Sequence, residues 1–304
     1  MPAYFAKQIT KIIRKFLIMD WKNARRSANV SDRRGGGKAP LGILGTIIVI
    51  IGVIFGQDVG TMLGLVETGA QFVGQSNTQQ VQNPTNDEQS DFIRVVLGAN
   101  EDLWQAQFQK YGLKFRPAQL VLFSNRVQSA CGAAGAEVGP FYCSADEKIY
   151  VDLNFINDMR RLGASNSNQV AGNFAMAYVI GHEYGHHISN LTGTLPKTHQ
   201  AMAKAGTKSD KNALSVRLEL QADCYAGVWA ANLAKYKINL NEQDISAGLT
   251  AASAVGDDRI MKSAGYSDNK INPENFTHGS AQQRKEWFAR GLQAREMTAC
   301  DTFR

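Results

Sequence analysis

The pattern that most limits what this chain can fold into is His-Glu-x-x-His at residues 182–186. On a helix, positions i and i+4 share one face, so His182 and His186 can direct their ring nitrogens at a common point. The stretch 169–189 contains no Pro and has apolar residues leading into the motif, which predicts that helix. Two imidazoles at this spacing suit a tetrahedral Zn²⁺, and Glu183 lies beside them, where it can accept a proton from metal-activated water. The alternative is a surface helix with two histidines.

A second predicted helix, at residues 215–236, is mostly apolar and carries Glu219 and Asp223 four positions apart. Zinc sites with two His on one helix commonly take a third ligand, often Glu, from another helix. Glu219 is therefore the candidate third ligand, and Asp223 can accept the second N–H of a ligand histidine and fix its tautomer. Carboxylates in apolar surroundings need a cation or a metal. Arg217 is a competing partner, and a solvated acidic pair is the alternative.

The net charge of +6 is concentrated at the amino terminus, since residues 1–38 contain ten Lys or Arg and two Asp, a local charge of +8. The rest of the chain is slightly acidic, so no nucleic-acid partner is predicted. Residues 1–38 are interpreted as a basic cytoplasmic tail. Its part at 1–18 is typical of an amphipathic helix on anionic lipid, and the alternative is that translation starts after these 18 residues. Residues 23–38 are typical of a flexible juxtamembrane segment attracted to the same surface.

An uncharged apolar run follows the tail. Residues 39–55 have no charged side chain, and the uncharged sequence resumes beyond Asp58. We therefore predict a transmembrane helix and a following juxtamembrane segment at 39–66. The excess of Lys and Arg before it places the amino terminus in the cytoplasm and the catalytic domain outside the cell membrane, in a periplasmic or extracytoplasmic position. A cleaved signal peptide and a buried core helix are the alternatives.

The remaining chain is predicted to be a polar linker at 67–85 and a main domain at 86–304. Helical periodicity predicts further helices at 87–111, at 242–264 and from Arg284 to about Arg295. Two short runs, 119–123 and 148–153, are typical of strands. The predicted fold class is α+β, mainly helical with a small sheet.

Four cysteines in a domain predicted to lie outside the membrane favour disulfides, for which three connectivities exist. We favour Cys131–Cys143 because the loop between them is short and rich in Gly, which leaves Cys224–Cys300. A Cys-rich zinc site is disfavoured, since the chain has no Cys-x-x-Cys pair. Free buried thiols would follow if the topology were different.

The motifs of this chain resemble a bacterial family, the YpfJ-like neutral zinc metallopeptidases. The matching segments are His182–His187, Arg217–Gly227, Gly139–Cys143, Gly256–Arg259, Phe276–Ser280 and Ala299–Phe303. The resemblance covers nearly the whole chain from about Met19. It implies a membrane-anchored zincin-like peptidase of the gluzincin type, in which the strands lie beside the cleft and an edge strand can pair with an extended peptide.

The segment Phe276–Ser280, followed by Arg284, is also similar to a Thr-His-Gly/Pro…Arg element of membrane CAAX-processing peptidases. In that interpretation His278 is a second candidate catalytic residue, which hydrogen-bonds the oxyanion as water attacks the carbonyl. The alternative is that His278 caps the last helix, which Ser280 would do equally well.

Together these observations predict a membrane-anchored peptidase that holds one Zn²⁺ per chain with His182, His186 and Glu219. Its partners would be peptide or protein substrates and, through the basic tail and the anchor, membrane lipid. Glu183 would act as the general base. The alternative is a zinc-stabilised envelope binding or assembly factor with little peptidase activity. A zinc amidase acting on cell-wall peptides would share the chemistry.

Overall fold

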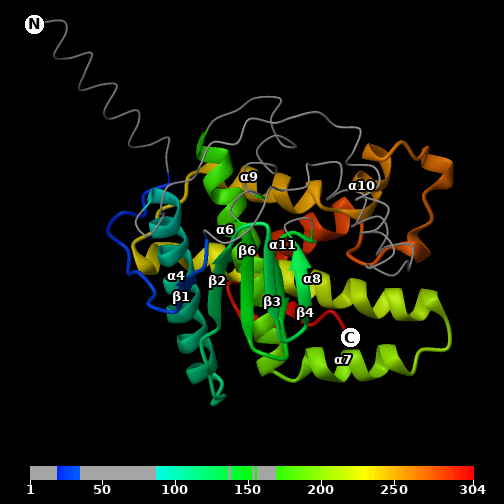
Figure 1. The fold of residues 1–304 in the computed structure, drawn as a ribbon, viewed down its shortest axis with the longest axis horizontal. Helices are drawn as coiled ribbons and strands as arrows, with labels where there is room; N and C mark the ends of the chain where they lie inside the picture. Colours follow the sequence, from blue (N-terminus) through cyan, green and yellow to red (C-terminus); the bar gives the residue numbers. More distant parts are fainter. Residues whose placement is uncertain (1–18, 35–86, 136–137, 153–154, 156–168) are drawn as a thin grey trace, which may run out of the picture.

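The computed structural model describes residues 19–34, 87–135, 138–152, 155 and 169–304. The predicted span and linker at 39–85 lie outside these ranges, as does the predicted amphipathic helix at 1–18. Within the described ranges, no helix is both long enough and apolar enough to cross a membrane. The described chain is mainly helical with a small sheet, which confirms the predicted α+β class (Figure 1).

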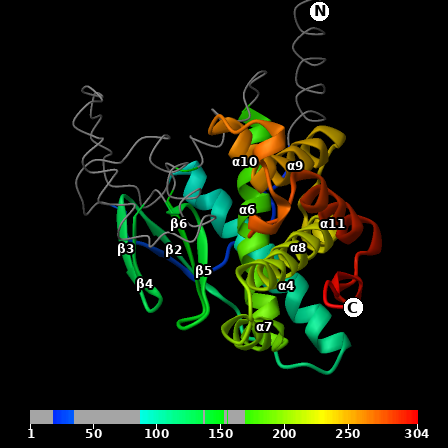
Figure 2. The ribbon, with the colours of Figure 1, turned by 90° about the vertical axis from the view of Figure 1, so that its right-hand side faces the viewer.

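One half of the molecule is a group of packed helices (Figure 2). Its members are α6 (Gln169–Leu191), α8 (Lys208–Asn232), α9 (Glu242–Ala254) and α11 (Ala281–Ala294). Helix α6 packs against α8 and α9, and α11 packs against the same two helices. Helix α7 (Thr194–Ala203) connects α6 to α8 and lies along α8. We call this group the helical half.

The predicted helix at 242–264 is two helices. Helix α9 ends at Ala254, and α10 (Asp257–Ser263) begins after Gly256. A Cβ atom on Gly256 would lie 2.2 Å from the backbone nitrogen of Ala281, so the chain bends here because it passes directly against the start of α11. The predicted helix at 215–236 also differs, since α8 begins at Lys208 with the Thr207 hydroxyl as its cap.

The other half contains a four-stranded sheet of order β1-β2-β6-β5 (Figure 2). Its strands are β1 (Val30–Asp32), β2 (Gln119–Phe123), β6 (Lys148–Asp152) and β5 (Phe141–Cys143). Strands β1, β2 and β6 are parallel, and β5 is antiparallel to β6 at the edge. The predicted runs correspond to β2 and β6. A separate hairpin pairs β3 (Arg126–Ser129) with β4 (Gly132–Gly135).

Helix α4 (Glu88–Lys110) joins the two halves through one continuous core. The Asp87 side chain accepts a hydrogen bond from the Ser90 N–H and caps the helix, which begins and ends within a residue of the prediction. Trp104 on α4 packs edge to face against Tyr225 on α8, with ring centroids 5.3 Å apart. Phe92, also on α4, is buried and contacts Trp21 in the chain before residue 35. We call the four-stranded sheet, the β3–β4 hairpin and α4 the sheet half.

The prediction of a flexible segment at 23–38 is wrong for the part that the structure describes, residues 23–34. Val30–Asp32 pairs with β2, and Trp21 lies buried against Phe92. Arg26 forms an ion pair with Asp91 of α4 at 2.7 Å. Arg26 therefore balances an acidic group of α4. The folded body includes residues 19–34 in addition to the main domain predicted at 86–304.

Both predicted disulfides are present. Cys131–Cys143 ties the β3–β4 hairpin to β5 in the sheet half, closing a separation of 12 residues. Cys224–Cys300 ties the carboxyl-terminal turn at Met297–Cys300 to the middle of α8 in the helical half, across 76 residues. Each half thus contains one crosslink.

Candidate metal centre

Small residues let α6 and α8 approach closely at the level of the His-Glu-x-x-His motif. A Cβ on Gly185 would lie 2.8 Å from the Cα of Ala222, and one on Gly181 would lie 3.1 Å from the Trp229 ring. Gly181 and Gly185 are one turn apart on α6, so the two glycines form a flat face toward α8. This close approach brings the motif within reach of the carboxylates on α8.

The structure brings the three predicted ligands together. The Nε2 atom of His182 lies 3.1 Å from Oε2 of Glu219, and Nε2 of His186 lies 3.3 Å from Oε1 of the same carboxylate. One ligand atom from each residue lies within 4.8 Å of the other two, and these three form the only such group among the described His, Cys, Asp and Glu residues.

The chemistry of this donor set fits Zn²⁺. Two imidazole nitrogens and one carboxylate are a typical set for a catalytic zinc, which leaves a further position open. Ligand atoms around a tetrahedral zinc are separated by roughly 3.3 Å, because each lies about 2.0–2.2 Å from the metal. The separations of 3.1 and 3.3 Å at Glu219 match that spacing. His182, His186 and Glu219 would therefore hold the ion.

Asp223 lies where its predicted role requires. It is fully buried, and its Oδ1 atom lies 2.8 Å from Nδ1 of His182, on the ring edge opposite to Glu219. Asp223 also accepts hydrogen bonds from the Arg284 guanidinium at 2.8 and 3.0 Å and from the Tyr178 hydroxyl at 2.5 Å. A carboxylate with these donors stays ionised and can fix the His182 tautomer whose Nε2 faces the metal.

The pKa shifts follow from these contacts in the metal-free protein. Burial lowers the pKa of His182, but the charges and hydrogen bonds of Asp223 and Glu219 outweigh it and raise that pKa from 6.5 to about 10. Burial raises the pKa of Glu219, but His186 and His182 outweigh it and hold the pKa well below 4.5. Zinc must therefore displace a proton from His182 when it binds.

Glu183 lies beside this group without contributing a ligand atom to it. Its side chain is buried at 8% exposure, and burial raises its pKa above the ordinary 4.5 despite the opposing charges of His182 and His186. A carboxyl group whose pKa is raised in this way is a better proton acceptor and can afterwards donate that proton.

His278 lies in a tight loop between α10 and α11 that is organised by one carboxylate. Asp257, which is fully buried, accepts the backbone N–H groups of Thr277, His278 and Gly279 on Oδ2 at 2.7, 2.7 and 3.0 Å. Its Oδ1 lies 3.1 Å from Nδ1 of His278. Gly279 has φ 92° and lies against Val216 and Leu220, so the loop contacts α8 on either side of Glu219.

The helix-cap alternative for His278 is wrong, because Ser280 caps α11 in a capping box with Gln283. Burial lowers the pKa of His278, but the Asp257 hydrogen bond and the Glu219 charge outweigh it and raise the pKa above 6.5. The contacts of the neighbouring Gly279 with Val216 and Leu220 place this loop beside the part of α8 that carries Glu219. The Nε2 atom of His278 has no hydrogen-bond partner among the described residues.

Sequence reasoning missed the roles of Arg284, Tyr178 and Asp257. Arg217, the predicted competitor for Glu219, stacks on Phe303 instead. Arg284 lies 3.9 Å from Glu219 and is buried at 3% exposure, so it is the cation that balances the α8 carboxylates. The only sequence signal for Arg284 was its position after the Thr-His-Gly segment. Its pairing with Glu219 could not be predicted, because the two residues lie far apart in the sequence.

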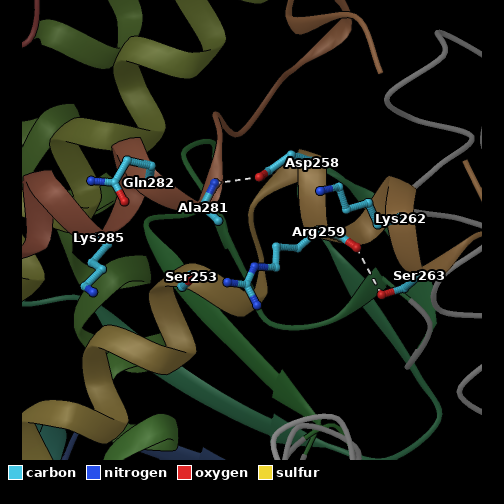
Figure 3. A pocket seen from close by; sticks show the side chains of 8 residues that line it. All are labelled: Ser253, Asp258, Arg259, Lys262, Ser263, Ala281, Gln282 and Lys285. Carbon is cyan, nitrogen blue, oxygen red and sulfur yellow. Dashed lines mark hydrogen bonds between the residues drawn. The ribbon is translucent and has the colours of Figure 1, made fainter. Parts of the chain in front are cut away.

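A cationic cavity of about 580 Å³ lies between α10 and the start of α11 (Figure 3). It is lined by Ser253, Asp258, Arg259, Lys262, Ser263, Ala281, Gln282 and Lys285. Asp258 accepts the backbone N–H of Ala281 at 2.7 Å across it. None of the ligand residues lines this cavity, so it is separate from the metal centre.

The chain is similar to one protein family and to bacterial proteins of two organisms. The family described as "Putative neutral zinc metallopeptidase" matches residues 19–303. The chain is 39% identical over 296 residues to the uncharacterized protein YpfJ of Escherichia coli, covering 94% of this chain and 99% of that protein. It is 43% identical over 223 residues to the uncharacterized protein Rv2575 of Mycobacterium tuberculosis, covering 69% of this chain and 70% of that protein. No solved structure matches significantly.

Proposed function

The chain belongs to the neutral zinc metallopeptidase family, and from that premise we propose that it is a membrane-attached zinc peptidase that hydrolyses peptide bonds in peptide or protein substrates. The observation that carries the proposal is the position of Glu183. A buried carboxylate with a raised pKa lies beside the group of His182, His186 and Glu219 but contributes no ligand atom to it. A zinc site with a purely structural role would have no need of that side chain.

When bound, Zn²⁺ supplies Lewis-acid chemistry, polarising a carbonyl and lowering the pKa of water. In the proposed reaction Glu183 takes the proton of the attacking water and transfers it to the leaving amine. Asp223 keeps the Nδ1 proton on His182, and Arg284 holds Asp223 in its ionised form. Asp257 holds Nδ1 of His278 by a hydrogen bond. In the proposed reaction Nε2 of His278 donates a hydrogen bond to the oxygen that gains negative charge in the transition state.

Strand β5 is the proposed site for the substrate backbone. It is an edge strand of the sheet and packs against α6, where the Tyr142 hydroxyl contacts Nδ1 of His187 at 3.0 Å. An extended peptide can add to such an edge by main-chain hydrogen bonds. His187 itself is buried and also contacts the carbonyl oxygen of Arg116 at 2.7 Å, so it fixes this edge against the helix and takes no part in metal binding.

The proposed location is outside the cytoplasm, at a membrane that the apolar run at 39–55 enters. The two disulfides support this location, because the cytoplasm keeps thiols reduced.

The test compares the purified full-length chain with its Glu183→Gln variant for zinc content and casein hydrolysis. We expect both to bind zinc equally, and the variant to lose at least about 100-fold in turnover because the proton acceptor is removed. Glu242→Gln, an exposed change in the first turn of α9, is the matched control and should keep full activity. Hydrolysis by Glu183→Gln at the wild-type rate would overturn the mechanism. Zinc in both proteins without cleavage in either would favour the binding or assembly factor.

A further inference from the structure

The segment Met19–Arg34 is bound to the rest of the fold at both of its ends, and its last part belongs to the sheet. Strand β1 pairs with β2 in parallel, with Val30 opposite Leu120. Two backbone hydrogen bonds of 2.8 Å flank this pairing. The Leu120 N–H donates to the Asn29 carbonyl, and the Arg33 N–H donates to the Leu122 carbonyl. The segment therefore forms one edge of the sheet.

The beginning of the segment, from Met19 to Arg25, also contacts the rest of the fold. Asp20 exchanges two backbone hydrogen bonds with Asn239, at 3.2 and 3.0 Å. Trp21 is buried at 4% exposure, and its ring centroid lies 5.2 Å from that of Phe92 on α4. A Cβ on Gly98 would lie 2.8 Å from the Arg25 carbonyl oxygen, so α4 has a glycine where this segment crosses it.

The charges of the segment are matched to α4. Arg25 contacts Glu101 at 2.7 Å and Asp102 at 2.8 Å. Glu101 is buried at 7% exposure and also accepts hydrogen bonds from the Ser27 hydroxyl and the Asn29 amide. Without the segment this buried carboxylate would lose its partners, which is costly. Arg25, Arg26 and Arg34, three of the basic residues that suggested a cytoplasmic tail, thus have acidic partners within the fold.

The two flanks of the stretch 35–86 meet at one point. Nη1 of Arg34, the last described residue before it, lies 2.7 Å from Oδ2 of Asp87, the first described residue after it. A chain that crosses a bilayer once separates its flanks by the hydrocarbon core, about 30 Å thick. Backbone and ion-pair contacts of 2.7–3.2 Å are incompatible with that separation.

From these contacts we propose that Met19–Arg34 lies on the same face of the membrane as the catalytic domain, held there as strand β1 and the α4-binding segment. The described residues on both sides of the stretch 35–86 then lie on one face of the membrane, which replaces the single crossing expected from the charge distribution. The disulfides assign the shared face to the oxidising side. The inference concerns sidedness alone and does not depend on peptidase activity.

The test is labelling of single introduced cysteines in the full-length chain with a membrane-impermeant maleimide. All four native cysteines are in disulfides, so the background is low. Ala28→Cys reports on the amino-terminal segment and Ala203→Cys on α7 of the catalytic domain, and both positions are exposed. We expect the two variants to be labelled to the same extent in intact cells and after permeabilisation. Labelling of Ala203→Cys in intact cells with protection of Ala28→Cys until permeabilisation would overturn the proposal.

A charge swap tests the contact independently of labelling. Arg26→Asp and Asp91→Arg should each lower the melting temperature of the full-length protein, because each leaves two like charges face to face at the position of the ion pair. The double swap should recover most of the loss. A double swap whose melting temperature falls by the sum of the single effects would show that the segment is not docked on α4, and the proposal would fail.

Discussion

The helical half and the sheet half are assembled in different ways. The metal centre is built from α6, α8 and the α10–α11 loop, which lie within one continuous stretch of sequence from 169 to 294. The sheet instead combines a strand from residues 30–32 with strands from 119–152. Chemistry in this molecule therefore depends on helix spacing, whereas the scaffold depends on pairing between distant segments. Changes at the ligand residues of the helical half should affect the proposed catalysis, and changes at the distant segments that pair in the sheet should affect stability.

The largest effect is expected from Glu219→Gln. The variant keeps the size of the side chain but loses the charged ligand that joins the two histidines. Loss of an outer partner of a metal ligand costs 10–100-fold in affinity, so loss of this ligand should weaken zinc binding by more than about 100-fold and abolish hydrolysis. Metal content after dialysis measures it. Unchanged zinc content would mean that the third ligand lies elsewhere.

Trp21→Ala should give the opposite result, with lower stability and an intact metal centre. Replacing a buried Trp with Ala costs about 3–5 kcal/mol, and Trp21 lies in the sheet half against Phe92. The neighbouring Lys22→Ala is the control, since that side chain is 72% exposed and should change stability by at most about 0.5 kcal/mol. Denaturant midpoints and zinc content report the two quantities. Equal midpoints for both variants would contradict the docking of this segment.

The two disulfides give a matched pair between the halves. Removing Cys224–Cys300 with two Ala substitutions should destabilise by about 4 kcal/mol, and removing Cys131–Cys143 by about 3 kcal/mol, because the loop closed by the first is longer. Thermal unfolding of the two double variants measures the difference. A larger loss from Cys131–Cys143 would show that the short β3–β5 loop contributes more than its length predicts.

A smaller effect is expected from Asp257→Asn. Removing the charge that holds Nδ1 of His278 should lower turnover roughly 10- to 100-fold, less than the loss of an oxyanion donor, with zinc retained. Because the carboxylate raises the His278 pKa, the protonated form persists to higher pH in the native enzyme, and stability from this pair is lost as pH rises through that raised pKa.

The alkaline limb of the pH–rate profile should therefore move to lower pH in Asp257→Asn. The adjacent Asp258→Asn is the control, since Asp258 contacts Ala281 and not His278. An unchanged limb in Asp257→Asn would remove His278 from the mechanism.

The difference between the halves also determined what the sequence could predict. His182, His186, Glu219 and Asp223 follow from i, i+4 spacing, which a helix converts directly into geometry. Arg284 and Asp257 do not, because their partners lie 61 and 21 residues away on other elements. Their roles depend on how helices pack, which periodicity does not specify.

The sheet shows the same limit more strongly. Strands β2 and β6 are short, mainly apolar and largely buried runs that local pattern identifies. Strand β1 has three residues, Val-Ser-Asp, and lies next to a run of Arg and Gly that is typical of a linker. Only its pairing with β2 and the acidic residues of α4 make it a strand, and both partners are more than 50 residues distant in sequence.

X-ray absorption at the zinc edge of the purified full-length protein would identify the metal ligands. We expect one zinc per chain with about four nitrogen or oxygen neighbours at about 2.0–2.2 Å, two of them imidazoles, and loss of this signal in Glu219→Gln. Sulfur neighbours at about 2.3 Å, or a zinc signal that Glu219→Gln leaves unchanged, would contradict this expectation.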